Sequence, residues 1–224
     1  MNDKNLEKLV FGMAHQIRNP CAIILANANL ILQQPDLKPE IRRSIESIVN
    51  GAKYLESRLD EFVEFSKPIN LTLKEISVNV LLNQTALLLS EKCQLKRTKI
   101  SCNLDGEYVL SKADYDLILL ALLNIALNSI ESIQEWGTII LEARLEGPHV
   151  IISVTDSGGG IHPKDLPEVF SPFYSTKQGG IGIGLAVSKK IIEAHEGTIQ
   201  VQSQFKQGTT IRIVLPGMRK EPHG

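Results

Sequence analysis

The stretch LLNIALNSIES, residues 122–132, lies in a long apolar segment and predicts the centre of a helix from about 112 to 135. Its asparagines, Asn124 and Asn128, are four residues apart and share one helix face. An apolar face gains nothing from two amides, and buried amides need partners. Capping or core hydrogen bonds explain most such pairs, but an asparagine carbonyl oxygen also suits Mg²⁺ surrounded by nucleotide phosphates. The pair alone does not decide between these interpretations.

The segments around this helix alternate between helix and strand patterns. They predict helices near 77–95 and 183–196, and strands near 98–104, 107–110, 138–145, 149–155, 198–203 and 209–215. This order predicts an α/β sandwich over residues 68–224. We place its boundary at Ser66-Lys67-Pro68, because a proline disfavours helix in the residue before it.

Residues 1–67 carry a different pattern, an apolar heptad repeat on two successive helices. The repeat comprises Leu6, Val10, Met13, Ile17, Pro20, Ile24 and Ile31, followed by Ile41, Ile45, Ile48, Ala52, Leu55, Leu59 and Phe62. The break QQPDLKP, residues 33–39, separates the two helices and predicts a helical hairpin. A lone hairpin cannot cover this stripe, so we expect a homodimer joined by a four-helix bundle. Packing of the hairpin on the rest of the chain is the alternative.

Composition excludes several classes of function. The 224 residues are 43% hydrophobic and 22% charged, and a net charge of −1 without a basic run argues against a nucleic-acid partner. Three cysteines form no CxxC pair, which favours reduced thiols and argues against zinc. No apolar run approaches the ~20 residues of a membrane span, so we expect no membrane segment and a cytoplasmic location. The fold class is therefore α+β, a dimeric helical hairpin followed by an α/β sandwich.

A histidine stands in the first helix, in GMAHQIRNP, residues 12–20. On a helical wheel His15 lies about half a turn from the apolar stripe, so its imidazole should face water. Asn19 follows one turn later on the same face. Pro20 leaves the Gln16 carbonyl without its usual helical donor, which should loosen or kink the helix just beyond His15.

Two glycine-containing segments and an aromatic segment between them follow in the second domain. In VIISVTDSGGGI a strand ends at Asp156 before Gly158 and Gly160, a pattern that fits either a ligand site or a simple turn. In GGIGIGLAVSKK, Gly180, Gly182 and Gly184 precede an apolar helix whose N-terminus could face an anion. Between them, VFSPFYSTK offers Phe170, Phe173 and Tyr174 to cover a base and Lys177 to bind phosphate, although a short hydrophobic lid is equally plausible.

These segments together resemble the sensor histidine kinases of two-component systems. HQIRNP, N-x-x-x-N, DSGGGI, FSPFYSTK, GGIGIGLA and QGTTI are similar to the H, N, G1, F and G2 boxes and the terminal Gly-Thr box, in order and across essentially the whole chain. The resemblance implies a dimerisation and phosphoacceptor hairpin over 1–67. It also implies a Bergerat-type ATP-binding domain over 68–224.

The resemblance also implies residue roles. His15 would be the phosphoacceptor, Asn128 the Mg²⁺ ligand, Asn124 its partner and Asp156 the adenine-binding aspartate. The nucleotide lid and phosphate loops would contain Gly158, Gly160, Gly180, Gly182 and Gly184, with Phe173 and Lys177 nearby and Thr209 closing the adenine pocket. Three positions depart from the family pattern: Gln16 replaces an acid, Glu131 a base that many members carry, and Ile181 a common threonine.

The resulting hypothesis is ATP- and Mg²⁺-dependent autophosphorylation of His15, followed by phosphoryl transfer to an aspartate of a response-regulator receiver domain. An exposed imidazole is largely neutral at cellular pH and leaves one ring nitrogen nucleophilic. Asn19 would orient water for dephosphorylating the regulator. Two alternatives remain: an ATP-driven clamp of the gyrase and Hsp90 type, which carries glutamate where this chain has Asn124, and a nucleotide-binding dimeric scaffold with weak kinase activity, which the substitution at Gln16 permits.

Overall fold

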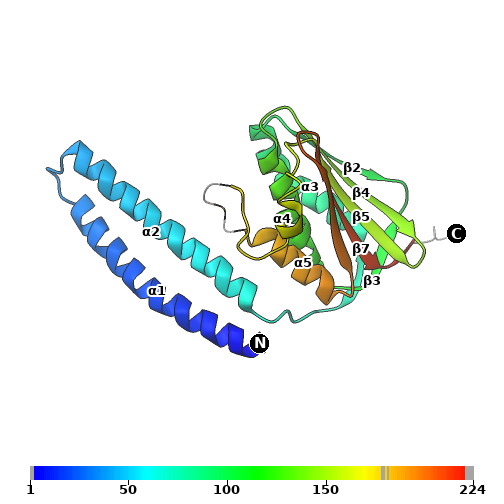
Figure 1. Ribbon diagram of the computed structural model, residues 1–224, viewed down its shortest axis with the longest axis horizontal. Helices are drawn as coiled ribbons and strands as arrows, with labels where there is room; N and C mark the ends of the chain where they lie inside the picture. Colours follow the sequence, from blue (N-terminus) through cyan, green and yellow to red (C-terminus); the bar gives the residue numbers. More distant parts are fainter. Residues whose placement is uncertain (1–2, 178–179, 181, 220–224) are drawn as a thin grey trace. The chain divides into compact units, whose positions relative to one another are not determined.

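The computed structural model describes residues 3–177, 180 and 182–219, and divides into two compact units, Met1–Pro68 and Ile69–Gly224. Unit 1 is a helical hairpin of α1 (Asp3–Leu32) and α2 (Pro39–Ser66), as Figure 1 shows. Helix α1 runs unbroken through Pro20, so the expected loosening does not end the helix. The two helices are also tied by an ion pair between Arg18 and Asp60.

The hairpin buries only part of the predicted apolar stripe. On α1 the buried side chains are Ala14, Cys21 and Ala28, which recur every seven residues and let α2 approach closely. On α2, Ile45 and Ala52 of the predicted stripe face inward. The other large apolar members with described side chains are more than a third exposed or half-buried; the exposed ones are Met13, Ile17, Ile24, Ile31, Ile41, Ile48 and Leu55. The side chains of Leu6 and Val10 lie outside the described part. Each helix thus carries two adjacent stripes, one inside the hairpin and one facing outward.

Unit 2 is an α/β sandwich, as the alternating pattern predicted. Its main sheet has the strand order β2-β4-β5-β7-β6, with β2 and β4 parallel and the other pairs antiparallel. The strands are β2 (Lys99–Leu104), β4 (Thr138–Glu146), β5 (His149–Asp156), β6 (Thr198–Gln204) and β7 (Gly208–Pro216). A smaller sheet has the order β1-β3-β8, formed by β1 (Lys74–Ser77), β3 (Tyr108–Ala113) and β8 (Met218–Arg219).

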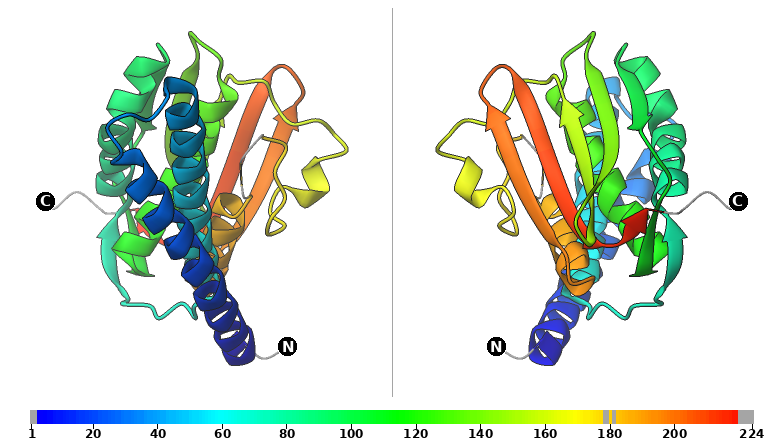
Figure 2. Two further views of the ribbon diagram at one scale, coloured as in Figure 1. Left: turned by 90° about the vertical axis from the view of Figure 1, so that its left-hand side faces the viewer. Right: turned by 90° about the vertical axis from the view of Figure 1, so that its right-hand side faces the viewer.

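Three helices cover one face of the main sheet (Figure 1), and the right-hand view of Figure 2 looks onto the opposite face. They are α3 (Val78–Leu95), α4 (Tyr115–Ser132) and α5 (Gly184–Ala194), and a short 3₁₀ helix spans Leu166–Glu168. Alternate residues of the strands pack against these helices in one hydrophobic core. Leu141, Ile152 and Ile213 are fully buried there. Helix α4 lies at the centre, with Ile118, Leu122 and Ile125 fully buried.

Helix α4 is the one described helix that is long and apolar enough to cross a membrane by length and composition. Its apolar side chains belong to the core of unit 2, and it carries two asparagines, so we interpret it as a core helix. Its C-terminal carbonyls are capped from α3 by the Lys96 ammonium, which donates to Ile130 O (3.0 Å) and Ile133 O (2.9 Å). The cap fixes the end of the helix that carries Asn124 and Asn128.

Candidate nucleotide and phosphoacceptor sites

The two asparagines of α4 lie beside the N-terminus of α5. A Cβ built on Gly184 would lie 3.8 Å from Asn128 Nδ2 and 3.9 Å from Asn124 Cβ. Both amides are half-buried and lie at the edge of the core rather than inside it. Ile183, which precedes α5, makes no side-chain cap to the helix. The first N–H groups of α5 and the two amides therefore form one polar corner.

The amide of Asn128 has a defined orientation. Its Nδ2 donates to Asn124 O at 3.1 Å, which turns Oδ1 away from α4. That oxygen accepts a hydrogen bond from the Lys177 ammonium at 3.1 Å, and the same ammonium pairs with Glu131. An amide carbonyl oxygen is a hard ligand of the kind that Mg²⁺ takes, and the orientation of this one is fixed.

Asp156 lies at the end of β5, near the C-terminus of α4. Its carboxylate is 6% exposed, and Oδ1 accepts from Gly158 N (2.8 Å) and from Ser132 Oγ (3.2 Å). Among the residues that the structure describes, no donor is bonded to Oδ2. A Cβ on Gly158 would come within 1.9 Å of Ser132 Oγ, so any side chain at this position would displace the Ser132 hydroxyl from Asp156. The arrangement leaves one carboxylate oxygen able to accept a hydrogen bond from a ligand.

Thr209 stands opposite Asp156 on the neighbouring strand β7. Its hydroxyl pairs with Ser203 Oγ at 2.9 Å, and Ser203 Oγ also accepts from Ile161 N at 2.8 Å. Gly160 precedes this contact with φ +62°. The structure therefore brings Asp156, Gly158, Gly160 and Thr209 to one end of the sheet.

The aromatic segment before α5 is held by backbone contacts. Gly182 has φ +71°, and a Cβ there would lie 2.0 Å from Tyr174 O, so only glycine fits. Gly182 O also accepts from Phe173 N at 3.1 Å. Tyr174 donates its hydroxyl to Asp165 Oδ1 at 2.6 Å, and this hydrogen bond raises the pKa of Tyr174. Gly180 is exposed, and Ile181 lies outside the described residues.

The predicted residues of unit 1 lie on the outside of α1. His15, Gln16 and Asn19 are all exposed, in agreement with the helical wheel, while Ala14 faces α2. Arg18, on the next turn, is held by Asp60 of α2. The imidazole is thus available to a macromolecular partner.

At the candidate nucleotide site, the sequence did not predict Ser132 as a site residue, and it did not predict what Glu131 contacts. Ser132 bonds Asp156, and its position four residues after Asn128 on the same helix face was the available signal. Glu131 was noted only as a departure, yet it pairs with Lys177, 46 residues away. No local pattern predicts a contact over that separation.

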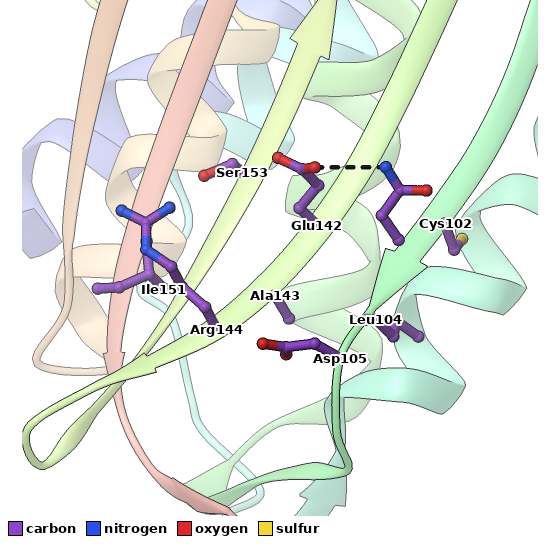
Figure 3. A pocket seen from close by; sticks show the side chains of 9 residues that line it. Cys102, Leu104, Asp105, Glu142, Ala143, Arg144, Ile151 and Ser153 are labelled. Carbon is purple, nitrogen blue, oxygen red and sulfur yellow. Dashed lines mark hydrogen bonds between the residues drawn. The ribbon is translucent and has the colours of Figure 1, made fainter.

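A separate hollow of about 580 Å³ lies over β2, β4 and β5 (Figure 3). Its lining includes Asn103, Glu142, Arg144 and Ser153, and Asn103 Nδ2 donates to Glu142 at 3.4 Å. None of the predicted site residues lines it. The hollow is therefore distinct from the polar corner of α4 and α5.

Each of the two units matches a known protein family. Residues 5–70 match the His Kinase A (phospho-acceptor) domain, and residues 113–219 match the family of histidine kinase-, DNA gyrase B- and HSP90-like ATPases. The sensor histidine kinase ZraS of Escherichia coli strain K12 is 35% identical over 221 residues, covering 98% of this chain and 48% of ZraS. The chain thus spans about half the length of the curated relatives it matches.

Two solved structures have a similar fold. Full-length ShkA in complex with AMPPNP is 25% identical with a TM-score of 0.75, covering 96% of this chain and 47% of ShkA. Histidine kinase ThkA in complex with the response regulator protein TrrA is 28% identical with a TM-score of 0.68, covering 93% of this chain and 61% of ThkA.

Proposed function

The chain belongs to the sensor histidine kinases, and from this we propose that it transfers the γ-phosphoryl group of ATP to His15 and then to an aspartate of a response regulator. The observation that carries the proposal is the polar corner of unit 2, where Asn124 and Asn128 meet the N-terminus of α5. The match of residues 5–70 to a phospho-acceptor domain argues against the clamp ATPase, which the second family model alone would allow. A cytoplasmic location, where ATP is available, is part of the proposal.

Unit 2 would bind the nucleotide between its two groups of predicted residues. Asp156 Oδ2 would accept a hydrogen bond from the exocyclic amine of adenine, while Ser132 Oγ and Gly158 N donate to Oδ1. Thr209 borders the base on β7. The N–H groups at the start of α5 bind the phosphates, because a helix N-terminus carries a partial positive charge.

Asn128 Oδ1 is the group that would hold Mg²⁺, and its fixed orientation fits a hard cation. Held by this residue, Mg²⁺ would supply charge neutralisation at the phosphate oxygens. The Lys177 ammonium donates a hydrogen bond to Asn128, so it is close enough to the proposed metal site to bind the same phosphates. Gly180, Gly182 and Gly184 lie along the backbone that leads into α5.

His15 supplies the nucleophile. The lone pair of one ring nitrogen attacks the γ-phosphorus, the bond to the bridging oxygen of ADP breaks, and ADP leaves. The proton on the other ring nitrogen must then be released. Gln16 can accept a hydrogen bond from that N–H group through its carbonyl oxygen, but it cannot take the proton. Water receives it instead.

Phosphohistidine would pass its phosphoryl group to a receiver-domain aspartate that docks on the exposed face of α1. The ThkA complex supports a partner of this kind, because that kinase was solved with a response regulator. Asn19, exposed one turn after His15, would orient water for removing the phosphoryl group from the regulator. We include this phosphatase activity in the proposal.

The test of the function is labelling with γ-labelled ATP and Mg²⁺. Phosphohistidine is a phosphoramidate, so the label should be lost in acid and retained in alkali. A label that survives acid would identify a phosphoester and contradict the proposal. A chain that binds nucleotide without ever becoming labelled would favour the scaffold alternative.

Asp156→Asn should weaken nucleotide binding by roughly 10- to 150-fold, because a hydrogen bond to a charged acceptor contributes about 1.5–3 kcal/mol. Calorimetry with Mg-ADP measures the change. Asp116→Asn is the control, since it makes the same charge change at an exposed site in the first turn of α4. Equal affinities of Asp156→Asn and the unmodified chain would remove Asp156 from the site.

We also propose that two copies pair through the outward apolar stripe of unit 1. Ile48 is 51% exposed there, and burial of an isoleucine stabilises by about 1.5–3 kcal/mol. Ile48→Glu should therefore weaken association at least about tenfold, as measured by light scattering across a concentration series. Ser47→Glu, at the exposed neighbouring position, should leave the dimer intact. A monomeric unmodified chain would refute the dimer.

A further inference from the structure

The Lys177 ammonium joins two side chains of α4. It donates to Asn128 Oδ1 at 3.1 Å and forms an ion pair with Glu131, which lies one turn further along the same helix. The two charged side chains are 42% and 55% exposed, so water screens the pair. Many members of the family carry a basic side chain at the position of Glu131, so the charge at this position is reversed in this chain. The positive charge near Asn128 is supplied by Lys177 instead.

Asn128 Oδ1 cannot serve two cations equally well. The Asn128 side chain has a single oxygen, and the hydrogen bond from its Nδ2 to Asn124 O holds the amide in one orientation. Two cations on one carbonyl oxygen repel each other. The bond from Lys177 therefore competes with metal binding at the same atom.

We propose that Glu131 lowers the affinity for Mg-nucleotide by holding Lys177 on Asn128, so that binding requires Lys177 to be displaced from Asn128 Oδ1. The inference rests on the proposed nucleotide site. Glu131 acts through Lys177 and is a positioning residue. When Lys177 is displaced, its ammonium leaves Glu131 and binds the phosphates of the nucleotide. The Glu131 carboxylate then loses its ion pair with Lys177.

A simpler explanation would give Glu131 a direct role. A carboxylate near a triphosphate repels it whether or not Lys177 is present. The two explanations differ in the Lys177→Gln background, where direct repulsion persists but there is no ammonium for Glu131 to hold. A double-mutant cycle separates them.

The first experiment is calorimetry of the whole chain with Mg-ADP, for the unmodified protein, Glu131→Gln, Lys177→Gln and the double variant. Glu131→Gln should bind about 2- to 5-fold more tightly, the range expected for loss of an exposed ion pair. In the Lys177→Gln background the same change should have no effect. Glu135→Gln is the control, because Glu135 is an exposed carboxylate that pairs with Arg97 instead.

A gain of equal size in both backgrounds, or an equal gain from Glu135→Gln, would overturn the inference in favour of general electrostatics. Absence of a gain would overturn it as well, while leaving the proposed function intact if the unmodified chain binds Mg-ADP. An unmodified chain that binds no nucleotide would refute the proposed function, and this inference with it.

A second readout uses no nucleotide. Trypsin must take the Lys177 side chain into its own specificity pocket, so cleavage after Lys177 requires release from Asn128 and Glu131. Glu131→Gln should accelerate this cleavage about 2- to 5-fold relative to cleavage after Lys92, which is exposed on α3. An unchanged ratio would show that Glu131 does not hold Lys177.

Discussion

His15→Ala should abolish acid-labile labelling by γ-labelled ATP, a loss of at least about 10³-fold, while Mg-ADP affinity stays within about twofold. The labelling loss is complete in principle, because alanine has no atom that can accept the phosphoryl group. The affinity is retained because Asn124, Asn128, Asp156 and the start of α5 all belong to unit 2, whereas His15 lies on α1 of unit 1. Labelling kinetics and calorimetry on the same preparation measure both quantities.

The control for this prediction is His162→Ala. His162 is exposed in unit 2 and stacks edge-on against Phe205 with ring centroids 5.4 Å apart. Its replacement should leave acid-labile labelling intact. Persistent labelling of His15→Ala would assign the acceptor to another residue, and loss of nucleotide affinity in that variant would show that the two units do not act separately.

The strand and helix order of unit 2 was predictable because its longer elements carry clear periods. Strand β7 alternates buried and half-buried residues along most of its length, β5 is a nearly continuous buried run, and α4 carries an apolar face with two asparagines at its edge. By contrast, β1 has four residues and β8 has two, which is too short to show a period, and neither was predicted. Their pairing with β3 depends on contacts between segments far apart in sequence.

The hairpin shows a second limit of sequence patterns. The heptad repeat predicts that α1 and α2 form a hairpin with an apolar stripe on each helix. It does not distinguish the residues buried inside the hairpin from those exposed on its outside. Small residues decide that division: Ala14, Cys21 and Ala28 are buried, while the larger Ile17 and Ile24 are exposed. Close helix packing selects small side chains, and a count of hydrophobicity alone misses them.

The candidate nucleotide site was predictable through the order of its motifs rather than through local chemistry. Asn128 and Gly184 are 56 positions apart, and their proximity follows only from the packing of α4 against α5. The contacts specific to this chain, between Lys177 and Glu131 and between Ser132 and Asp156, depend on side-chain reach after folding. These contacts could not be derived from a pattern of residues along the chain.

Gln16→Glu should accelerate autophosphorylation by roughly 10²-fold with little change in ATP affinity. Family members carry an acid here, and general base catalysis contributes at least about 10²-fold when the base is in place. Gln16 is exposed directly after His15, so a carboxylate at this position adds a proton acceptor without disturbing the hairpin core. The amide of the unmodified chain can orient the imidazole through its carbonyl oxygen but cannot receive the proton. The measurement is the initial labelling rate at saturating Mg-ATP and neutral pH.

The control for Gln16→Glu is Asn29→Asp, which adds the same charge at an exposed position of α1 far from His15. It should leave the labelling rate unchanged, because its carboxylate lies several helical turns from the imidazole. Regulator dephosphorylation should change less than labelling in Gln16→Glu, because Asn19, the residue that we propose to orient water for that reaction, is intact. The unmodified chain would then be a slow autokinase whose output favours dephosphorylation. An unchanged or lower labelling rate in Gln16→Glu would mean that water already removes the proton fast enough and that position 16 does not limit the reaction.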